Sequence, residues 1–145
     1  MREILFRGKR FDNGKWIEGG YIPLDVDSGY TYIIEPCNYA STFSALDLIK
    51  LHSILVIPST VGQYTGLTDK NGVKIFEGDI LAANFDEDFP ENLTIVEVVW
   101  NEYGWCTKEG SAVPDAFDDS DGDLFEVIGN IHDNPELLKV GDNNE

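Results

Sequence analysis

Alternating hydrophobic and polar residues near the start of the chain predict antiparallel β structure. The first segment places Ile4 and Phe6 on one face of a short strand, and Asn13-Gly14 marks a tight hairpin turn before a second strand begins near Trp16. Another turn then precedes a segment rich in β-branched and aromatic residues. The first 35 residues therefore predict an antiparallel β meander.

A change of hydrophobic period predicts one short helix after this meander. Phe43, Leu46 and Ile49 recur at spacings of three residues, as on one face of a helix over about residues 43–52. Residues 1–59 are therefore expected to form an N-terminal, β-rich subdomain with a short helix.

Short strands separated by glycines predict a different arrangement over residues 60–131. The strongest alternation lies in residues 92–100, and Gly129 marks a bulge or kink in the closing strand. This spacing of strands favours a small, SH3-like β-barrel.

Residues 132–145 predict a short helix followed by a frayed tail. The helix is expected to begin at Pro135, after a cap at Asp133 or Asn134. The fold class is thus mainly β.

The charge of the chain limits its partners. Ten basic and 27 acidic residues give a net charge of −17, and residues 101–145 alone carry 2 basic and 12 acidic groups. Direct binding to nucleic acid or to an anionic membrane needs clustered cations, so neither is expected. Neutral or basic proteins, or a second copy of the chain, are the favoured partners.

Neither the cysteines nor the apolar segments indicate secretion or membrane insertion. Cys37 and Cys106 are too few for a disulfide framework or a zinc site, and both are expected to be reduced. Charged residues interrupt the N-terminal segment, and no apolar run approaches the length of a membrane span. We therefore expect a soluble, cytoplasmic protein.

Two acidic segments, 86–92 and 114–123, are interpreted as surface loops with too few apolar residues for a core to hold them. A calcium site in the second loop is a weaker alternative, because Gly and Glu are absent from the sixth and twelfth positions of an EF-hand counted from Asp119. The loops supply the candidate partner surface, which consists of Asp86, Glu87, Asp88, Asp118, Asp119, Asp121 and Asp123.

The remaining chemically active residues favour structural roles. Glu77 and Asp79 resemble a catalytic carboxylate pair, but an aspartate after Gly78 is more simply explained as a turn residue that accepts backbone N–H bonds. His52 and His132 have no second metal ligand at helical spacing. No catalytic, metal-binding or cofactor-binding residue is therefore assigned, and no cofactor is expected.

Four aromatic residues suggest a surface that stacks bases, namely Tyr64, Trp100, Tyr103 and Trp105. The strong negative charge opposes that function, so packing in a core or at a protein interface is the preferred explanation.

Three segments carry a specific pattern of motifs: MREILFRGKRFDNGKW at 1–16, VGQYTGLTDKNGVKIFEGDIL at 61–81 and FEVIGNIHDNPELL at 125–138. In order and spacing they resemble the YopX family of phage and prophage proteins. The resemblance implies a small, largely β protein encoded by a phage of Gram-positive bacteria, and it carries over no catalytic residues. The chain departs from the family pattern in the length and acidity of the loops at 86–91 and 114–123.

These observations lead to a non-enzymatic phage accessory protein that assembles with itself or binds a protein partner. The alternative is an acidic nucleic-acid mimic, whose carboxylates at 86–91 and 115–126 occupy a basic DNA-binding protein. An enzyme with an unrecognised site is the least favoured class, because no nucleophile, base and stabilising group converge.

Overall fold

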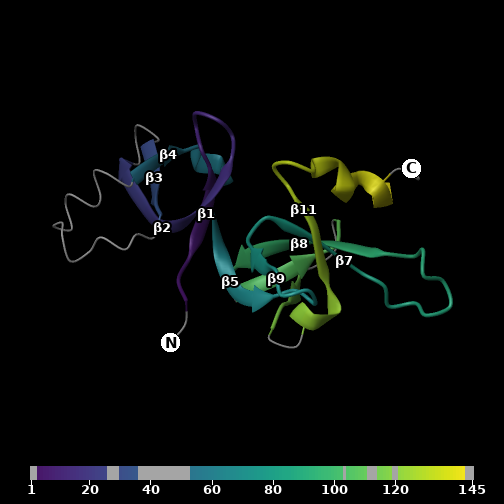
Figure 1. Ribbon diagram of the computed structural model, residues 1–145. Coiled ribbons are helices and arrows are strands. Elements are labelled where there is room, and N and C mark those ends of the chain that lie inside the picture. The colour runs from purple at the N-terminus through teal and green to yellow at the C-terminus, as the bar shows by residue number, and fades with distance from the viewer. Residues whose placement is uncertain are drawn as a thin grey trace. The chain divides into compact units, whose positions relative to one another are not determined.

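The computed structural model describes residues 3–25, 30–35, 53–102, 104–110, 114–118 and 121–142. The chain divides into a first unit, Met1–Tyr64, and a second unit, Thr65–Glu145. Both units are built from antiparallel strands (Figure 1), which confirms the mainly β class. The predicted helix over 43–52 lies outside the described residues.

The first unit is a meander of consecutive strands, as predicted. The first four strands pair antiparallel in chain order, and the first part of the fifth strand pairs with the first strand. The elements are β1 (Phe6–Lys9), β2 (Trp16–Asp25), β3 (Tyr30–Ile34), β4 (Ser53–Val56), the 3-10 helix η1 (Pro58–Thr60) and β5 (Gly62–Thr68), which ends in the second unit.

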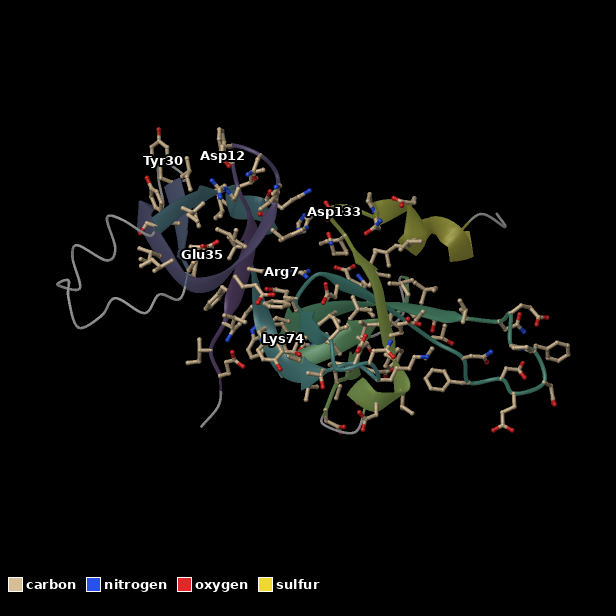
Figure 2. All side chains as sticks on the ribbon, in the orientation of Figure 1. Arg7, Asp12, Tyr30, Glu35, Lys74 and Asp133 are labelled. Carbon is tan, nitrogen blue, oxygen red and sulfur yellow. The ribbon has the colours of Figure 1, made fainter. Side chains whose placement is uncertain are left out.

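The predicted hairpin turn at Asn13-Gly14 joins β1 to β2. The backbone N–H of Arg10 donates to the carbonyl of Lys15 at 2.9 Å, and Gly14 takes a positive φ of 71° that suits a residue without a β-carbon. Asp12 lies at the tip of this connection (Figure 2), where its carboxylate is 2.8 Å from Arg10 Nη2. Both partners are exposed, so this ion pair adds little stability.

The core of the first unit is small and centres on Ile17, Ile33 and Val56. Its sheet curls, because β4 pairs with β3 along one edge and meets the end of β1 along the other. There the N–H of Ile57 donates to Lys9 at 2.9 Å, and the N–H of Phe11 donates to Leu55 at 3.0 Å. These bonds satisfy backbone groups that a free sheet edge would leave unpaired.

The second unit contains a five-stranded sheet in the order β10-β9-β8-β7-β11. At the start of this unit, the end of β5 is the neighbour of β6. At its end, η3 follows the last strand and contacts β8. The elements are β6 (Lys74–Phe76), β7 (Asp79–Ala83), β8 (Thr94–Asn101), β9 (Gly104–Lys108), β10 (Asp115–Ala116), η2 (Gly122–Leu124), β11 (Glu126–Asn130) and η3 (Pro135–Asp142).

One face of this sheet carries the main core. Alternation along β8 directs Val96 and Val98 to that face, where they pack with Leu81 of β7. Phe117 and Phe125 complete the same cluster from segments outside the central strands. Figure 1 shows the connection between β7 and β8 extending beyond the sheet.

The SH3-like barrel expected over 60–131 is not what the described residues show. Here β10 and β11 are the two ends of the strand order, so this sheet is open. The physical reason lies in the segment 114–123, where charged residues interrupt the apolar alternation and leave a strand of only two residues, Asp115–Ala116. Such a short edge strand pairs with β9 and offers little backbone for a further partner.

The acidic segment at 114–123 is also better anchored than expected. Phe117 within it is only 7% exposed and belongs to the core cluster. Its backbone N–H donates to the carbonyl of Trp105 at 3.0 Å. The expectation that this loop has no hold on a core was therefore wrong, because one aromatic residue suffices to anchor it.

The bulge predicted at Gly129 is confirmed. The register of β11 against β7 shifts between Val127 and Gly129, and the chain then turns through Asn130. The Asn130 Oδ1 accepts the N–H groups of His132 and Asp133, each at 2.9 Å. These bonds fix the turn that leads into η3.

Gly129 provides a stability test of this turn. A β-carbon there would lie 2.5 Å from Oδ1 and 2.8 Å from Cγ of Asn134. We expect Gly129→Ala to lower the free energy of unfolding by about 1–3 kcal/mol, as overpacking usually does. Because Asn134 Cβ also lies 2.9 Å from this position, the coupling is measured by urea unfolding of Gly129→Ala, Asn134→Gly and the double variant, and the alanine at 129 should cost less when residue 134 is glycine. Equal losses in both backgrounds would refute this steric explanation.

A candidate acidic groove for a protein partner

The candidate site is built on the core-bearing face of the second unit's sheet. Thr94 and Val96 share this face, because side chains two positions apart on a strand point the same way. In the antiparallel register, Thr107 of β9 lies opposite Val98 on one side and Asp115 of β10 on the other. Three neighbouring strands therefore bring threonine, valine and aspartate side chains to one surface.

A row of aromatic rings forms the apolar part of the site. The ring of Phe125 lies edge-on to Phe117 at 6.2 Å and to Phe85 at 5.9 Å between centroids. Phe117 and Phe125 are each 7% exposed, whereas Phe85 is 58% exposed. The row thus runs from the core to the surface, so the apolar floor is held rigidly while its outer ring remains accessible.

The row lines a hollow of about 380 Å³ with an acidic rim. Glu109, Asp115 and Asp121 supply its carboxylates, and the described lining residues include no lysine or arginine. The full lining is Phe85, Thr94, Val96, Thr107, Glu109, Asp115, Ala116, Phe117, Asp121, Leu124 and Phe125.

A second, more open hollow of about 630 Å³ shares two of these lining residues, Phe85 and Thr94. It adds Asp86, Glu87 and the exposed Leu93. Together the two hollows are termed the acidic groove. It combines an aromatic floor with carboxylates contributed by segments about 30 residues apart in the chain.

The structure brings part of the predicted partner surface into this groove. Asp86 and Glu87 line the open hollow, and Asp121 lines the deeper one. Asp88 and Asp123 are exposed but do not line either hollow. The remaining two aspartates differ again: Asp118 also lies outside both linings and donates its N–H to Asp121 Oδ2 at 2.9 Å, and Asp119 lies outside the described residues.

Sequence reasoning missed the groove's other carboxylates and its aromatic floor. Glu109 was not considered, and Asp115 entered only as part of the 115–126 segment of the mimic hypothesis. Phe85, Phe117 and Phe125 were not predicted to form an apolar lining beside the acidic residues. A partial signal exists in the alternation of Thr107 and Glu109, which places both on one face of a strand. The pairing of β9 with β10, which brings Asp115 opposite Thr107, follows only from the structure.

Asp69 is a buried carboxylate with a structural role. It is 3% exposed, and its Oδ1 accepts the N–H groups of Asn71 at 2.8 Å and Val73 at 2.9 Å. Its Oδ2 accepts the N–H of Val127 at 2.9 Å, which ties the 69–73 turn to β11. Burial alone would raise its pKa, but the three backbone donors outweigh burial and hold the pKa below its ordinary value.

Asp79 has the turn role that the sequence favoured. It is 1% exposed, and its Oδ2 accepts the N–H of Phe76 at 2.8 Å. Gly78 takes a φ of 89°, which a residue with a side chain rarely adopts. The two residues thus close the tight turn between β6 and β7, and the proposed pairing of Asp79 with Glu77 for acid–base chemistry has no support from this geometry.

The opposite face of the sheet carries a different carboxylate. Glu97 of β8 lies opposite Lys108 of β9 and is half-buried. Burial raises its pKa above the ordinary value, and the charge of Lys108 only partly offsets this effect. Glu97 follows Val96 and precedes Val98, so alternation turns it away from the acidic groove.

The other residues considered from sequence take packing roles. Tyr64 and Cys106 are buried, and Trp105 packs against the core of the second unit. Trp100 is 58% exposed and lies edge-on to Trp105 at 4.8 Å. The other three candidates, Cys37, His52 and Tyr103, lie outside the described residues.

Two features are absent from the residues that the structure describes. No group of three or more His, Cys, Asp or Glu side chains is placed to hold a metal ion. No described helix is long and apolar enough to cross a membrane.

Comparisons with known proteins point to one family. A family model described as YopX protein matches residues 5–139. A solved structure, that of protein EF1440 from Enterococcus faecalis, is similar with 27% sequence identity and a TM-score of 0.56, and the match covers 95% of this chain and 99% of that one. A search of curated proteins gave no match.

Proposed function

Because this chain belongs to the YopX family, we propose that it is a phage-associated protein that binds another protein and is not an enzyme. The acidic groove is the proposed binding surface, and the cytoplasm of a bacterial host is the proposed place of action. The partner is either a second copy of the chain or a different protein.

The observation that carries this proposal is the acidic groove itself. Phe85, Leu93 and Leu124 are 58%, 56% and 52% exposed, and each of them lines one or both of its hollows. Large apolar side chains gathered around a concavity are typical of protein-binding surfaces, whereas isolated ones are ordinary. A rigid aromatic floor gives a partner side chain a place to be desolvated, which is how most binding energy is concentrated.

Binding is favoured over catalysis because the two most buried carboxylates already accept hydrogen bonds from the backbone. Asp69 accepts three backbone N–H groups, and Asp79 accepts one in the turn before β7. A general acid or base must reach a substrate atom, and these two groups instead hold the fold together.

Mimicry of nucleic acid is the second candidate, and it is supported by the acidic loops. A mimic would use negative charge wherever it is exposed, including Asp88 and Asp123 outside the groove. A groove binder would depend on Phe85 and on the lining carboxylates. Variants of Asp88 and Asp123 therefore test mimicry, and variants of Phe85 test binding in the groove.

The test is affinity capture from lysate of a Gram-positive host with matched variants. We expect a protein that is retained by the wild-type chain and by Phe89→Ala to lose most of its signal with Phe85→Ala. The two phenylalanines belong to the same connection and have similar exposures of 58% and 53%, but only Phe85 lines the groove. Analytical ultracentrifugation of the same variants tests self-association, in which case the oligomer dissociates with Phe85→Ala only.

Retention that falls equally with Phe85→Ala and Phe89→Ala would contradict the assignment of the groove. Retention that is lost with Asp88→Asn/Asp123→Asn but not with Phe85→Ala would favour mimicry instead. Circular dichroism of each variant confirms that the fold is kept, and Leu124→Ser provides a second groove variant if Phe85→Ala fails to fold.

A further inference from the structure

We infer that the acidic groove accepts an extended, basic peptide segment that carries an apolar anchor residue. This inference rests on the proposed function and names the chemistry of the partner. It follows from the groove's charge, from its apolar lining and from the arrangement of its two hollows.

The charge of the groove selects a cationic partner. Five carboxylates line the two hollows, and the described lining residues include no lysine or arginine to neutralise them. Arginine and lysine side chains that approach the rim would form charge-assisted hydrogen bonds with these carboxylates.

The floor requires an apolar group as well. Phe85 and Leu124 line the same hollow as the buried rings of Phe117 and Phe125, and they are themselves 58% and 52% exposed. A strictly polar, cationic segment would leave this apolar surface in contact with water. An aromatic or aliphatic anchor would bury it and would pack edge-on against the existing rings, which is the favoured geometry of aromatic pairs.

The arrangement of the hollows favours an extended segment over a compact ligand. The deeper hollow holds about 380 Å³, and the open one beside it shares Phe85 and Thr94 as a common wall. Carboxylates stand on both sides of that wall, with Asp86 in one hollow and Asp115 in the other. A peptide chain spans about 3.3–3.6 Å per residue when extended, so a few residues reach from one hollow to the other.

The experiment uses fluorescein-labelled synthetic peptides of nine residues and fluorescence anisotropy with the full chain. One peptide is Lys/Arg-rich with a central Phe, and its three matched controls replace Phe by Ser, the basic residues by Gln, or the basic residues by Glu. We expect the basic peptide with Phe to bind most tightly. Each of the three changes should weaken binding by about tenfold or more, which corresponds to the loss of one good contact.

Matched variants of the chain test the position of the site. Glu109→Gln/Asp115→Asn should weaken the basic peptide by about tenfold and leave the Gln-containing peptide unchanged. Asp88→Asn/Asp123→Asn removes the same number of charges outside the groove and should change the affinity by less than about threefold. Phe85→Ala should weaken binding of the basic peptide and of the Gln-containing peptide, which both carry Phe, and Leu124→Ser repeats this measurement if Phe85→Ala is unstable.

Several outcomes would overturn the inference while leaving the proposed function intact. Equal binding of the Gln- and Lys/Arg-containing peptides would show an apolar site without charge selection. Equal binding of the Phe and Ser peptides would show charge attraction without an anchor. No binding of any peptide, together with a captured protein that is lost with Phe85→Ala, would show that the groove recognises a folded surface. The proposed function fails separately if neither capture nor self-association responds to Phe85→Ala.

Discussion

Replacing Asp69 with alanine is expected to lower the free energy of unfolding by about 3 kcal/mol or more. The carboxylate accepts three backbone N–H groups, from Asn71, Val73 and Val127, and it is 3% exposed. Alanine would leave these donors without an acceptor in a nearly water-free site. An unsatisfied buried donor typically costs about 1–3 kcal/mol, and hydrogen bonds to charged groups are stronger than average.

Urea unfolding followed by far-UV circular dichroism measures this loss. Asp69→Asn should lie between the wild type and Asp69→Ala, because the amide oxygen can accept two of the bonds while its NH₂ group faces the third donor. Asp123→Ala, an exposed aspartate outside the acidic groove, serves as the control and should change stability by less than about 0.5 kcal/mol. A loss below about 1 kcal/mol for Asp69→Ala would show that water replaces the carboxylate easily.

The lowered pKa of Asp69 also fixes the pH dependence of this effect. A carboxyl group whose pKa is lower in the folded state stabilises the fold at every pH above its unfolded pKa, for which the ordinary value is 3.8. That contribution is lost as the pH falls from this value through the lower folded pKa. The difference in stability between the wild type and Asp69→Asn should therefore be constant near neutral pH and shrink below pH 3.8.

Gly19→Ala is expected to be the most damaging single change in the first unit, with a loss of about 3 kcal/mol or more. A β-carbon at this position would overlap the backbone carbonyl oxygen of Ile34 and lie 3.1 Å from Ile33 Cγ2. Backbone cannot move aside as a flexible side chain can. The pairing of β2 with β3 would have to open for the alanine to be accommodated.

The neighbouring glycine provides a control for this prediction. A β-carbon at Gly20 would meet nothing within 4 Å, so Gly20→Ala should be neutral or slightly stabilising. Hydrogen exchange of the β2 and β3 amides, measured for both variants, reports on the unit directly. Similar protection in Gly19→Ala and Gly20→Ala would contradict the prediction, because it would show that the strands move apart at Ile34 without loss of stability.

The local fold was predictable where short-range chemistry decides it. Asn13-Gly14 predicts a hairpin because such turns require positive φ, and Gly14 takes a φ of 71°. Gly129 predicts a bulge, and the register of β11 shifts there. The alternation of 92–100 predicts the strand that the structure places at Thr94–Asn101. In each case, residues within a few positions carry the whole signal.

The sheet order and the acidic groove were not predictable in the same way. Closure of a barrel depends on which edge strands meet, and the sequence 114–123 gave no measure of how short β10 is. Phe117 was assigned to a solvated loop because its neighbours are acidic, although it packs against Phe125. Glu109 and Asp115 come together through the pairing of β9 with β10, which local patterns do not encode.

The most direct test of the acidic groove as a partner surface is site-specific photo-crosslinking. The photoreactive residue p-benzoylphenylalanine replaces Leu124 in the groove or, as a control, Trp100 on β8. The two side chains are similarly exposed, at 52% and 58%, and they belong to the same unit. After irradiation in host lysate, we predict one discrete adduct from the Leu124 position and none from the Trp100 position. An adduct from the Trp100 position alone, or the same adducts from both, would contradict the account.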